Sequence, residues 1–160
     1  MSFNHFDERG QAIMVDVSGK QPTMRSAIAA ATVSMGPATL AELLDGRTAK
    51  GDVLGVARLA GIAAAKKTSD LIPLSHPLAI HHVTIDFATN PDAGTVRIEA
   101  TVRAFERTGV EMEAMTSAAV AALTVYDMCK GRDKGIAISD IVLLYKEGGK
   151  SGVYERKDHR

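Results

Sequence analysis

Residues 83–103 read VTIDFATNPDAGTVRIEATVR, and this stretch decides the fold class. Apolar residues alternate with polar ones from Val83 to Phe87 and again from Val96 to Arg103. Such alternation is typical of a strand with one buried and one solvated face. The turn-forming residues Asn90–Gly94 lie between the two runs, so the stretch predicts an antiparallel β-hairpin.

The elements on either side of the hairpin complete an α+β pattern. Apolar residues at three- and four-residue spacing predict a helix over Met112–Lys130, and Ile136–Tyr145 predicts a closing strand. Asp52 is expected to cap an earlier helix that runs to about Lys67. Met24–Met35 fits either a helix, because of its alanines, or a strand. The order of elements predicts a ferredoxin-like sandwich, an antiparallel sheet with helices on one face.

Several smaller features follow from the same patterns. Met14–Ser18 predicts a short strand, and Thr39 is expected to cap a short helix that ends at Asp45-Gly46. Pro73 and Pro77 bracket a rigid loop. The apolar stripes expected to face the core are Val53, Val56, Leu59, Ala60 and Ala63 in the earlier helix, and Met112, Met115, Ala119, Ala122, Tyr126 and Cys129 in the later one.

Length and composition predict one domain over residues 1–160, with mobile ends at 1–10 and 153–160. The chain lacks the run of roughly 18 apolar residues that a membrane span needs, so no membrane partner is expected. A formal net charge of +0 and few aromatic residues argue against nucleic-acid binding. A single cysteine and the polar start of the chain favour a reducing compartment, the cytoplasm.

Two apparent motifs fail on inspection. Gly148–Gly152 suggests a phosphate-binding P-loop, but that motif needs a glycine at the position of Leu144 and a helix afterwards. His76, His81 and His82 suggest a metal site, but neighbouring strand residues point to opposite faces, so we predict no metal site. His76 itself is of more interest, because rigid loops that carry a titratable group suit catalysis.

The later helix carries the strongest candidates for chemistry. Asp127 and Lys130 are three residues apart in an apolar stretch, so they can touch and tune each other's pKa. Glu113 lies on the same stripe, roughly 21 Å from Asp127 at about 1.5 Å per residue. If both serve one small ligand, the site must lie between subunits. Candidates for an anion pocket are Arg25, Arg47, Lys50, Lys130, Lys146 and Lys150.

The chain resembles the MoaC family, the cyclic pyranopterin monophosphate synthases of molybdenum cofactor biosynthesis, over residues 5 to 152. The motifs that carry the resemblance are Met14–Val17, Lys50–Val53, Asp70–Leu78, Thr108–Ala114, Ala122–Lys130 and Gly148–Gly152. The resemblance implies a lyase that converts 3′,8-cyclo-7,8-dihydroguanosine 5′-triphosphate to cyclic pyranopterin monophosphate and releases pyrophosphate. It also implies a homohexamer, a trimer of dimers with active sites at subunit boundaries.

The resemblance also implies roles for individual residues. Asp127, Lys130, Lys50 and His76 look like the catalytic set. The expected substrate contacts are Leu74, Ser75, His76, Glu111, Met112, Glu113, Arg25, Lys146 and Lys150. No cofactor is certain, although Mg²⁺ could assist pyrophosphate release together with the cationic side chains. Many relatives carry Cys at the position of Ser75, so a thiol is not expected to act there, and Cys129 lies at a different position.

Binding modules are the main alternative class. Ferredoxin-like domains often sense small ligands at dimer interfaces, so a nucleotide-sensing module without turnover stays open on the residues alone. A nucleic-acid module would need stacking aromatic residues on the sheet, for which only Phe87 and Phe105 are near candidates.

Overall fold

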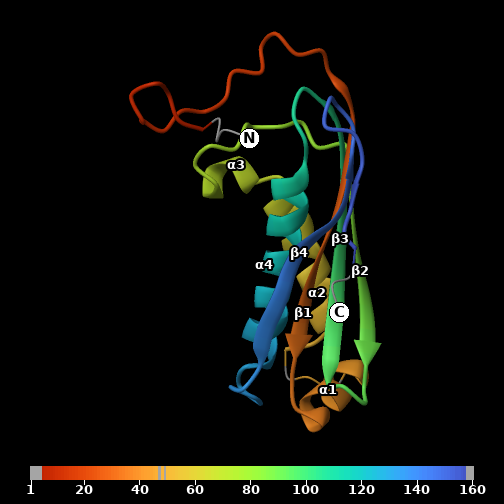
Figure 1. Ribbon diagram of the computed structural model, residues 1–160. Coiled ribbons are helices and arrows are strands. Elements are labelled where there is room, and N and C mark those ends of the chain that lie inside the picture. Colours follow the sequence, from red (N-terminus) through yellow and green to blue (C-terminus); the bar gives the residue numbers. More distant parts are fainter. Residues whose placement is uncertain (1–4, 47, 49, 158–160) are drawn as a thin grey trace.

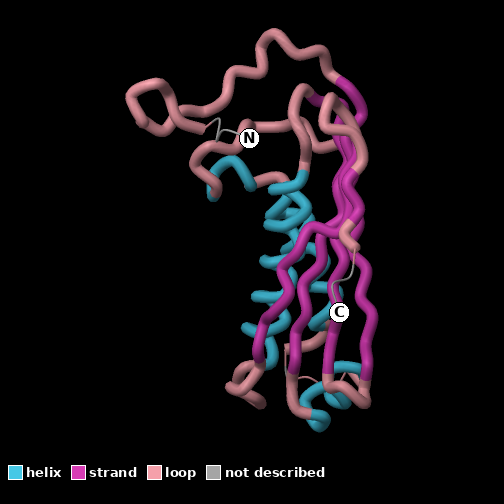
Figure 2. Tube along the Cα trace, in the orientation of Figure 1, coloured by secondary structure: helices cyan, strands magenta, loops and turns pink. Residues whose placement is uncertain are grey.

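The computed structural model describes residues 5–46, 48 and 50–157, and it forms one twisted sheet covered by helices on one face (Figure 1). The strands are β1 (Thr23–Ser34), β2 (His82–Asn90), β3 (Thr95–Glu106), β4 (Ala137–Glu147) and β5 (Tyr154–Glu155), and the helices are α1 (Pro37–Leu44), α2 (Val53–Ala65), α3 (Thr68–Leu71) and α4 (Glu111–Cys129). Figure 2 shows the helical layer lying along the sheet. None of these helices is long and apolar enough to cross a membrane.

The sheet has the strand order β2-β3-β1-β4-β5, and its pairs are antiparallel. The first four strands therefore follow the ferredoxin-like plan, with β5 added at one edge. The predicted hairpin is confirmed as β2 and β3, which pair in register from His82 with Arg103 to Asn90 with Thr95. The predicted fold class is confirmed.

The ambiguous segment Met24–Met35 forms most of the central strand, β1. Its alanines at 27, 29, 30 and 31 are fully buried, because β3 and β4 flank the strand, and α4 packs on the face that carries Ala27, Ala29 and Ala31. Alanine favours a helix in isolation, but here its small side chain lets a helix approach the sheet closely. Tertiary packing therefore decides the conformation of this segment.

Helices α2 and α4 approach each other at Gly61. The Ser117 hydroxyl of α4 donates a 2.9 Å hydrogen bond to the Gly61 carbonyl of α2, and both atoms are buried. A Cβ built on Gly61 would collide with Ile85 Cδ1 and would lie 3.0 Å from the Ser117 carbonyl oxygen. The contact therefore requires the absence of a side chain at Gly61.

We expect Gly61→Ala to destabilise the protein by about 1–2 kcal/mol. Overpacking at this contact costs about 1–3 kcal/mol, and the better helix propensity of alanine recovers about 1 kcal/mol at most. Urea unfolding measures the difference. Ala63→Gly, at an exposed position of the same helix, gives the propensity term alone. A Gly61→Ala variant more stable than wild type would contradict this account of the packing.

The predicted strand at Met14–Ser18 is wrong. Residues 14–17 are extended coil, and nearby the only pairing among the described residues is an isolated bridge between Phe6 and Ala12. The segment has no strand beside it. Instead it arcs over the end of the molecule where α4 begins (Figures 1 and 2).

The predicted caps are partly correct. Asp52 caps α2 as expected, because its carboxylate accepts a 2.9 Å bond from the Gly55 amide. Thr39 is not a cap: α1 begins at Pro37 after Gly36, and Thr39 is buried within the helix. Proline is favoured at this first position because its missing N–H would be unpaired there anyway.

The predicted core stripes are also partly wrong. In α2 the buried residues are Val53, Ala57, Gly61, Ala64 and Ala65, whereas Val56 and Leu59 are exposed. In α4, Ala122 and Cys129 are buried as expected, but Met112 is exposed and Ala114, Ala118, Ala121 and Val125 form most of the core contact. Small residues face the sheet because the helices lie close to it, which a ranking by hydrophobicity misses.

The ends of the chain are only partly described. Residues 1–4 and 158–160, and also Arg47 among the anion-pocket candidates, lie outside the described residues. Tyr154–Glu155 pairs with Tyr145 and Lys146 of β4, within a stretch that the sequence predicted to be mobile.

Candidate active site

The C-terminal end of α4 carries a cluster of three charged residues, which we call the Asp127 cluster. Lys130 Nζ donates to Asp127 Oδ1 at 2.6 Å. Lys50 Nζ lies 3.5 Å from Asp127 Oδ2 and donates a 2.8 Å bond to the Asp127 backbone carbonyl. One carboxylate therefore lies between two ammonium groups that come from distant parts of the sequence.

The Asp127 cluster is exposed, with 58% of the Asp127 side chain accessible. Asp127 is exposed although its neighbours in the sequence are apolar, because Val125 and Cys129 are buried and Asp127 points away from the core; the predicted contact between Asp127 and Lys130 is confirmed. The Lys130 ammonium, with Lys50 adding to it, lowers the pKa of the Asp127 carboxyl. Asp127 in turn raises the pKa of Lys130.

The backbone around the cluster is fixed by caps. Lys130 is the C-cap of α4, and in the turn that follows, Asp133 accepts 2.8 Å bonds from the Gly36 and Gly135 amides. Asp133 thereby ties the end of α4 to the start of α1. Lys50 lies in a turn that the Gly51 amide closes with a 3.0 Å bond to the Thr48 carbonyl, just before the capped start of α2 at Asp52.

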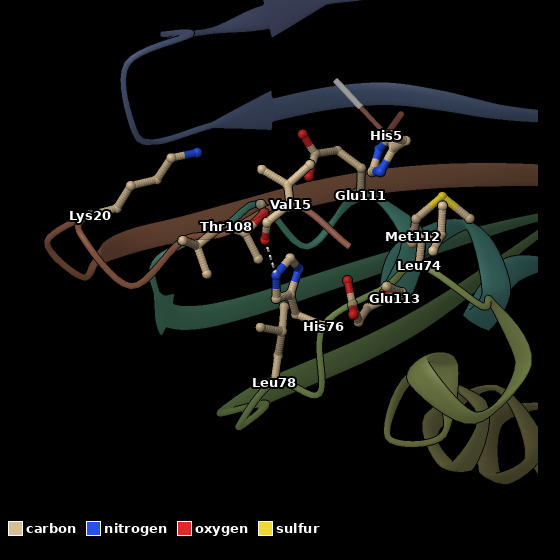
Figure 3. A pocket seen from close by; sticks show the side chains of 13 residues that line it. His5, Val15, Lys20, Leu74, His76, Leu78, Thr108, Glu111, Met112 and Glu113 are labelled. Carbon is tan, nitrogen blue, oxygen red and sulfur yellow. Dashed lines mark hydrogen bonds between the residues drawn. The ribbon is translucent and has the colours of Figure 1, made fainter. Parts of the chain in front are cut away.

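A pocket of about 310 Å³ lies at the opposite end of α4, and we call it the imidazole pocket after His76 (Figure 3). The predicted residues that line it are Leu74, Ser75, His76, Glu111, Met112 and Glu113. His76 Nε2 lies 2.7 Å from the Val15 carbonyl oxygen. A carbonyl only accepts, so Nε2 carries the proton and donates, and in the neutral ring Nδ1 is an acceptor.

Glu113 is the unusual group of the imidazole pocket. It is 2% exposed, and its carboxyl group points toward the His76 ring in Figure 3. Burial raises the pKa of Glu113 to about 7, against a smaller lowering by its own backbone N–H and with help from the charge of Glu111. A carboxyl group with this pKa can both give and take a proton near neutral pH.

A second cavity, of about 720 Å³, adjoins the imidazole pocket, and we call it the basic hollow. Three of the six candidates for an anion pocket line it: Arg25, Lys146 and Lys150. Lys146 Nζ donates to Glu111 Oε1 at 2.7 Å in a half-buried pair. Both cavities are lined by Glu111 and Lys20, so an elongated ligand can reach from one into the other.

The predicted site residues thus fall into two groups at the two ends of α4 (Figure 1). Lys50, Asp127 and Lys130 come together at one end, and the other predicted residues line the two cavities at the other end. Within one chain the structure does not bring His76 next to Asp127. The length of α4 explains this: Glu113, which lines the pocket with His76, lies roughly 21 Å along the helix from Asp127.

Several cavity residues were missed by the reasoning from sequence: His5, Val15, Val17, Lys20, Leu78 and Thr108. Val15 and Val17 lie on the segment that was predicted to be a strand. Lys20 had a usable signal, because it is a cation in the turn that precedes β1. Thr108 belonged to a motif that carried the family resemblance.

The remaining candidates have structural explanations. His81 Nδ1 accepts a 3.3 Å bond from the Phe105 amide, next to the end of β3. Among the described residues, no group of three or more His, Cys, Asp or Glu side chains is arranged to hold a metal ion. Cys129 is buried, and burial raises the pKa of its thiol.

Comparison with known proteins gives one consistent result. Residues 14–149 match the sequence profile of the MoaC family. A cyclic pyranopterin monophosphate synthase of Geobacter metallireducens is 77% identical over 158 residues, 99% of each chain. The synthase of Geotalea uraniireducens is 74% identical over 160 residues, 100% of each chain. A more distant one, from Pelotomaculum thermopropionicum, is 55% identical over 153 residues, 96% of this chain and 90% of the relative.

Proposed function

The chain belongs to the MoaC family, and on that premise we propose that it makes cyclic pyranopterin monophosphate in molybdenum cofactor biosynthesis. The enzyme is a lyase, and its substrate is 3′,8-cyclo-7,8-dihydroguanosine 5′-triphosphate. The observation that carries the proposal is the contact between two cavities: a pocket with groups that can transfer protons opens into a cationic hollow. The substrate joins a purine-derived base to a triphosphate, so the base needs groups that transfer protons and the triphosphate needs cations.

The proposed reaction begins at the purine. Water opens its five-membered ring, and the pyranopterin ring then closes, so protons move between nitrogen, oxygen and water at each step. In the proposal His76 and Glu113 exchange protons with the base in the imidazole pocket, and Leu74, Ser75 and Met112 contact it. Near neutral pH the Glu113 carboxyl is available in both protonation states, which favours this role.

The reaction ends at the phosphates. The sugar hydroxyl attacks the innermost phosphorus, a P–O bond forms to the sugar, and the bond to the departing pyrophosphate breaks. Cations lower this barrier by neutralising charge on the leaving group. We assign this task to Arg25, Lys146 and Lys150, with Glu111 holding Lys146 in place.

The proposal routes none of these steps through Mg²⁺. Among the described residues that line the basic hollow, the carboxylate is Glu111, and its Oε1 is engaged by Lys146. The hollow thus offers cations to phosphate oxygens, and in the proposal these side chains neutralise the charge on the leaving group.

The Asp127 cluster completes the proposed site from a second copy of the chain. In the proposal the protein is a homohexamer, a trimer of dimers in the cytoplasm, and Asp127, Lys130 and Lys50 of one copy meet the imidazole pocket of another. Covering the exposed ion pair would remove water, which raises the pKa of the aspartate and lowers that of the lysine. Both groups then move toward values suited to proton transfer.

Incubation of the purified protein with the cyclised triphosphate tests the proposed function. We expect cyclic pyranopterin monophosphate and pyrophosphate to form in equal amounts, as followed by mass spectrometry and a pyrophosphate assay. Binding without conversion would instead identify a nucleotide-sensing module. Sedimentation of the same sample tests the assembly, and a fully active monomer would refute a site shared between subunits.

A further inference from the structure

The loop that joins β4 to β5 lies directly on the guanidinium group of Arg25. Arg25 is 9% exposed, and its Nε and Nη2 donate 3.1 Å bonds to the carbonyl oxygens of Glu106 and Arg107. These bonds fix the guanidinium at the wall of the basic hollow. Its other terminal nitrogen, Nη1, faces Gly149 of the loop.

Gly149 has no room for a side chain. A Cβ built there would collide with Arg25 Nη1, and the guanidinium cannot retreat without breaking its bonds to the two carbonyls. The backbone of Gly149 also has φ +71°, which side chains disfavour. Gly152 in the same loop has φ +66°, but a Cβ built there meets nothing within 4 Å. The two glycines therefore share the backbone constraint and differ in their contact with Arg25.

Lys150 follows Gly149 and lines the same hollow as Arg25. We propose that Gly149 is a positioning residue for the phosphate-binding cations. Its bare Cα lets the loop close onto Arg25, and this contact sets the places of the Arg25 guanidinium and the Lys150 ammonium together. The inference rests on the proposed function for the identity of the bound phosphates, whereas the packing contact stands without it.

The test compares Gly149→Ala with Gly152→Ala in the full-length protein. Calorimetric titration with inorganic tripolyphosphate measures the cationic site without any chemistry. Displacing one charge-assisted contact corresponds to about tenfold weaker binding for Gly149→Ala, and Gly152→Ala is expected within about twofold of wild type. Equal affinities for the two variants, or a wild-type protein that does not bind tripolyphosphate, would overturn the proposal.

A double-mutant cycle identifies Arg25 as the group through which Gly149 acts. Arg25→Ala alone weakens tripolyphosphate binding, and adding Gly149→Ala to it is expected to cause no further loss, because the guanidinium is already gone. Penalties that multiply in the double variant would show that Gly149 acts by another route. With the cyclised triphosphate, Gly149→Ala is expected to lower kcat as well as raise KM, because the same cations hold the triphosphate before the reaction and neutralise charge on the leaving pyrophosphate as the bond breaks.

If Gly149→Ala does not fold, thermal unfolding of the double variant Arg25→Ala/Gly149→Ala still tests the steric argument. The Arg25→Ala background vacates the space that a Cβ would need, so the double variant is expected to fold, and its failure to fold would overturn the steric argument. Failure of the proposed function gives a different result. In that case wild-type protein produces no cyclic monophosphate, while the ratio of tripolyphosphate affinities still decides the role of Gly149.

Discussion

Replacing Asp127 by asparagine is expected to lower kcat about 1,000-fold, in the range that positioned acid–base groups contribute. The amide keeps the shape of the side chain but cannot take a proton, and it no longer holds two ammonium groups by charge. The fold should survive, because the Asp127 cluster is exposed and exposed ion pairs contribute little to stability. Steady-state turnover of the cyclised triphosphate and the thermal midpoint are measured on the same sample.

Glu42→Gln is the matched control for Asp127→Asn. Glu42 forms a 2.9 Å ion pair with Arg132, which lies in the turn just after the Asp127 cluster. Glu42 has no assigned role in the reaction. Both variants remove one carboxylate from an ion pair at the same end of α4. Only Asp127→Asn should lose turnover, and both should keep a midpoint within about 3 °C of wild type. Equal activity in the two variants would show that Asp127 has no role in the reaction.

The hairpin of β2 and β3 could be predicted from the sequence because its information is local. Alternation fixes which side chains are buried, and the turn Asn90–Gly94 fixes the register. Segment Met24–Met35 could not be assigned, since alanine fits both a helix and a strand. Its conformation follows from β3 and β4 on either side, which are about 70 and 110 positions further along the chain.

The candidate site shows the same division. His76 was a good candidate because two prolines fix its loop, and Asp127 and Lys130 were good candidates because three-residue spacing on a helix brings side chains together. Lys50 was included in the catalytic set through the family resemblance, and the structure adds its contact with Asp127. Lys20 and Val15 were missed because the segment that carries them to the imidazole pocket is irregular. Its sequence has no alternation or helical spacing from which side-chain positions could be predicted.

The orientation of Asp127 does not follow from its apolar neighbours in the sequence. A run of apolar neighbours indicates burial only when the helix is buried on all sides, and α4 has one face away from the sheet. Glu113, by contrast, is surrounded by fewer apolar neighbours in the sequence and is 2% exposed. The chain bends at Arg107 and Thr108, before α4, and the first turn of the helix lines the same pocket as Leu74, Ser75 and His76.

Glu113 is expected to make the stability of the protein depend on pH. Its folded pKa is about 7, above the ordinary glutamate value of 4.5, so over this range the folded protein binds more protons than the unfolded chain. Stability therefore falls as pH rises from about 4.5 to about 7, and it levels off above that. The difference in pKa corresponds to about 3 kcal/mol. Glu113→Gln removes the titration and should not show this loss.

Urea unfolding of wild type and Glu113→Gln at about pH 4.5 and about pH 8 measures the effect, because the difference between the proteins cancels every other titrating group. From the lower to the higher pH, Glu113→Gln should gain about 3 kcal/mol relative to wild type. Glu99→Gln, which removes an exposed carboxylate paired with Arg97, should gain little. The same carboxyl group should give kcat/KM a pH dependence centred near 7 that Glu113→Gln lacks. A stability difference that does not change with pH would mean that Glu113 is ionised throughout, and the proton transfer assigned to it would then have to come from His76 alone.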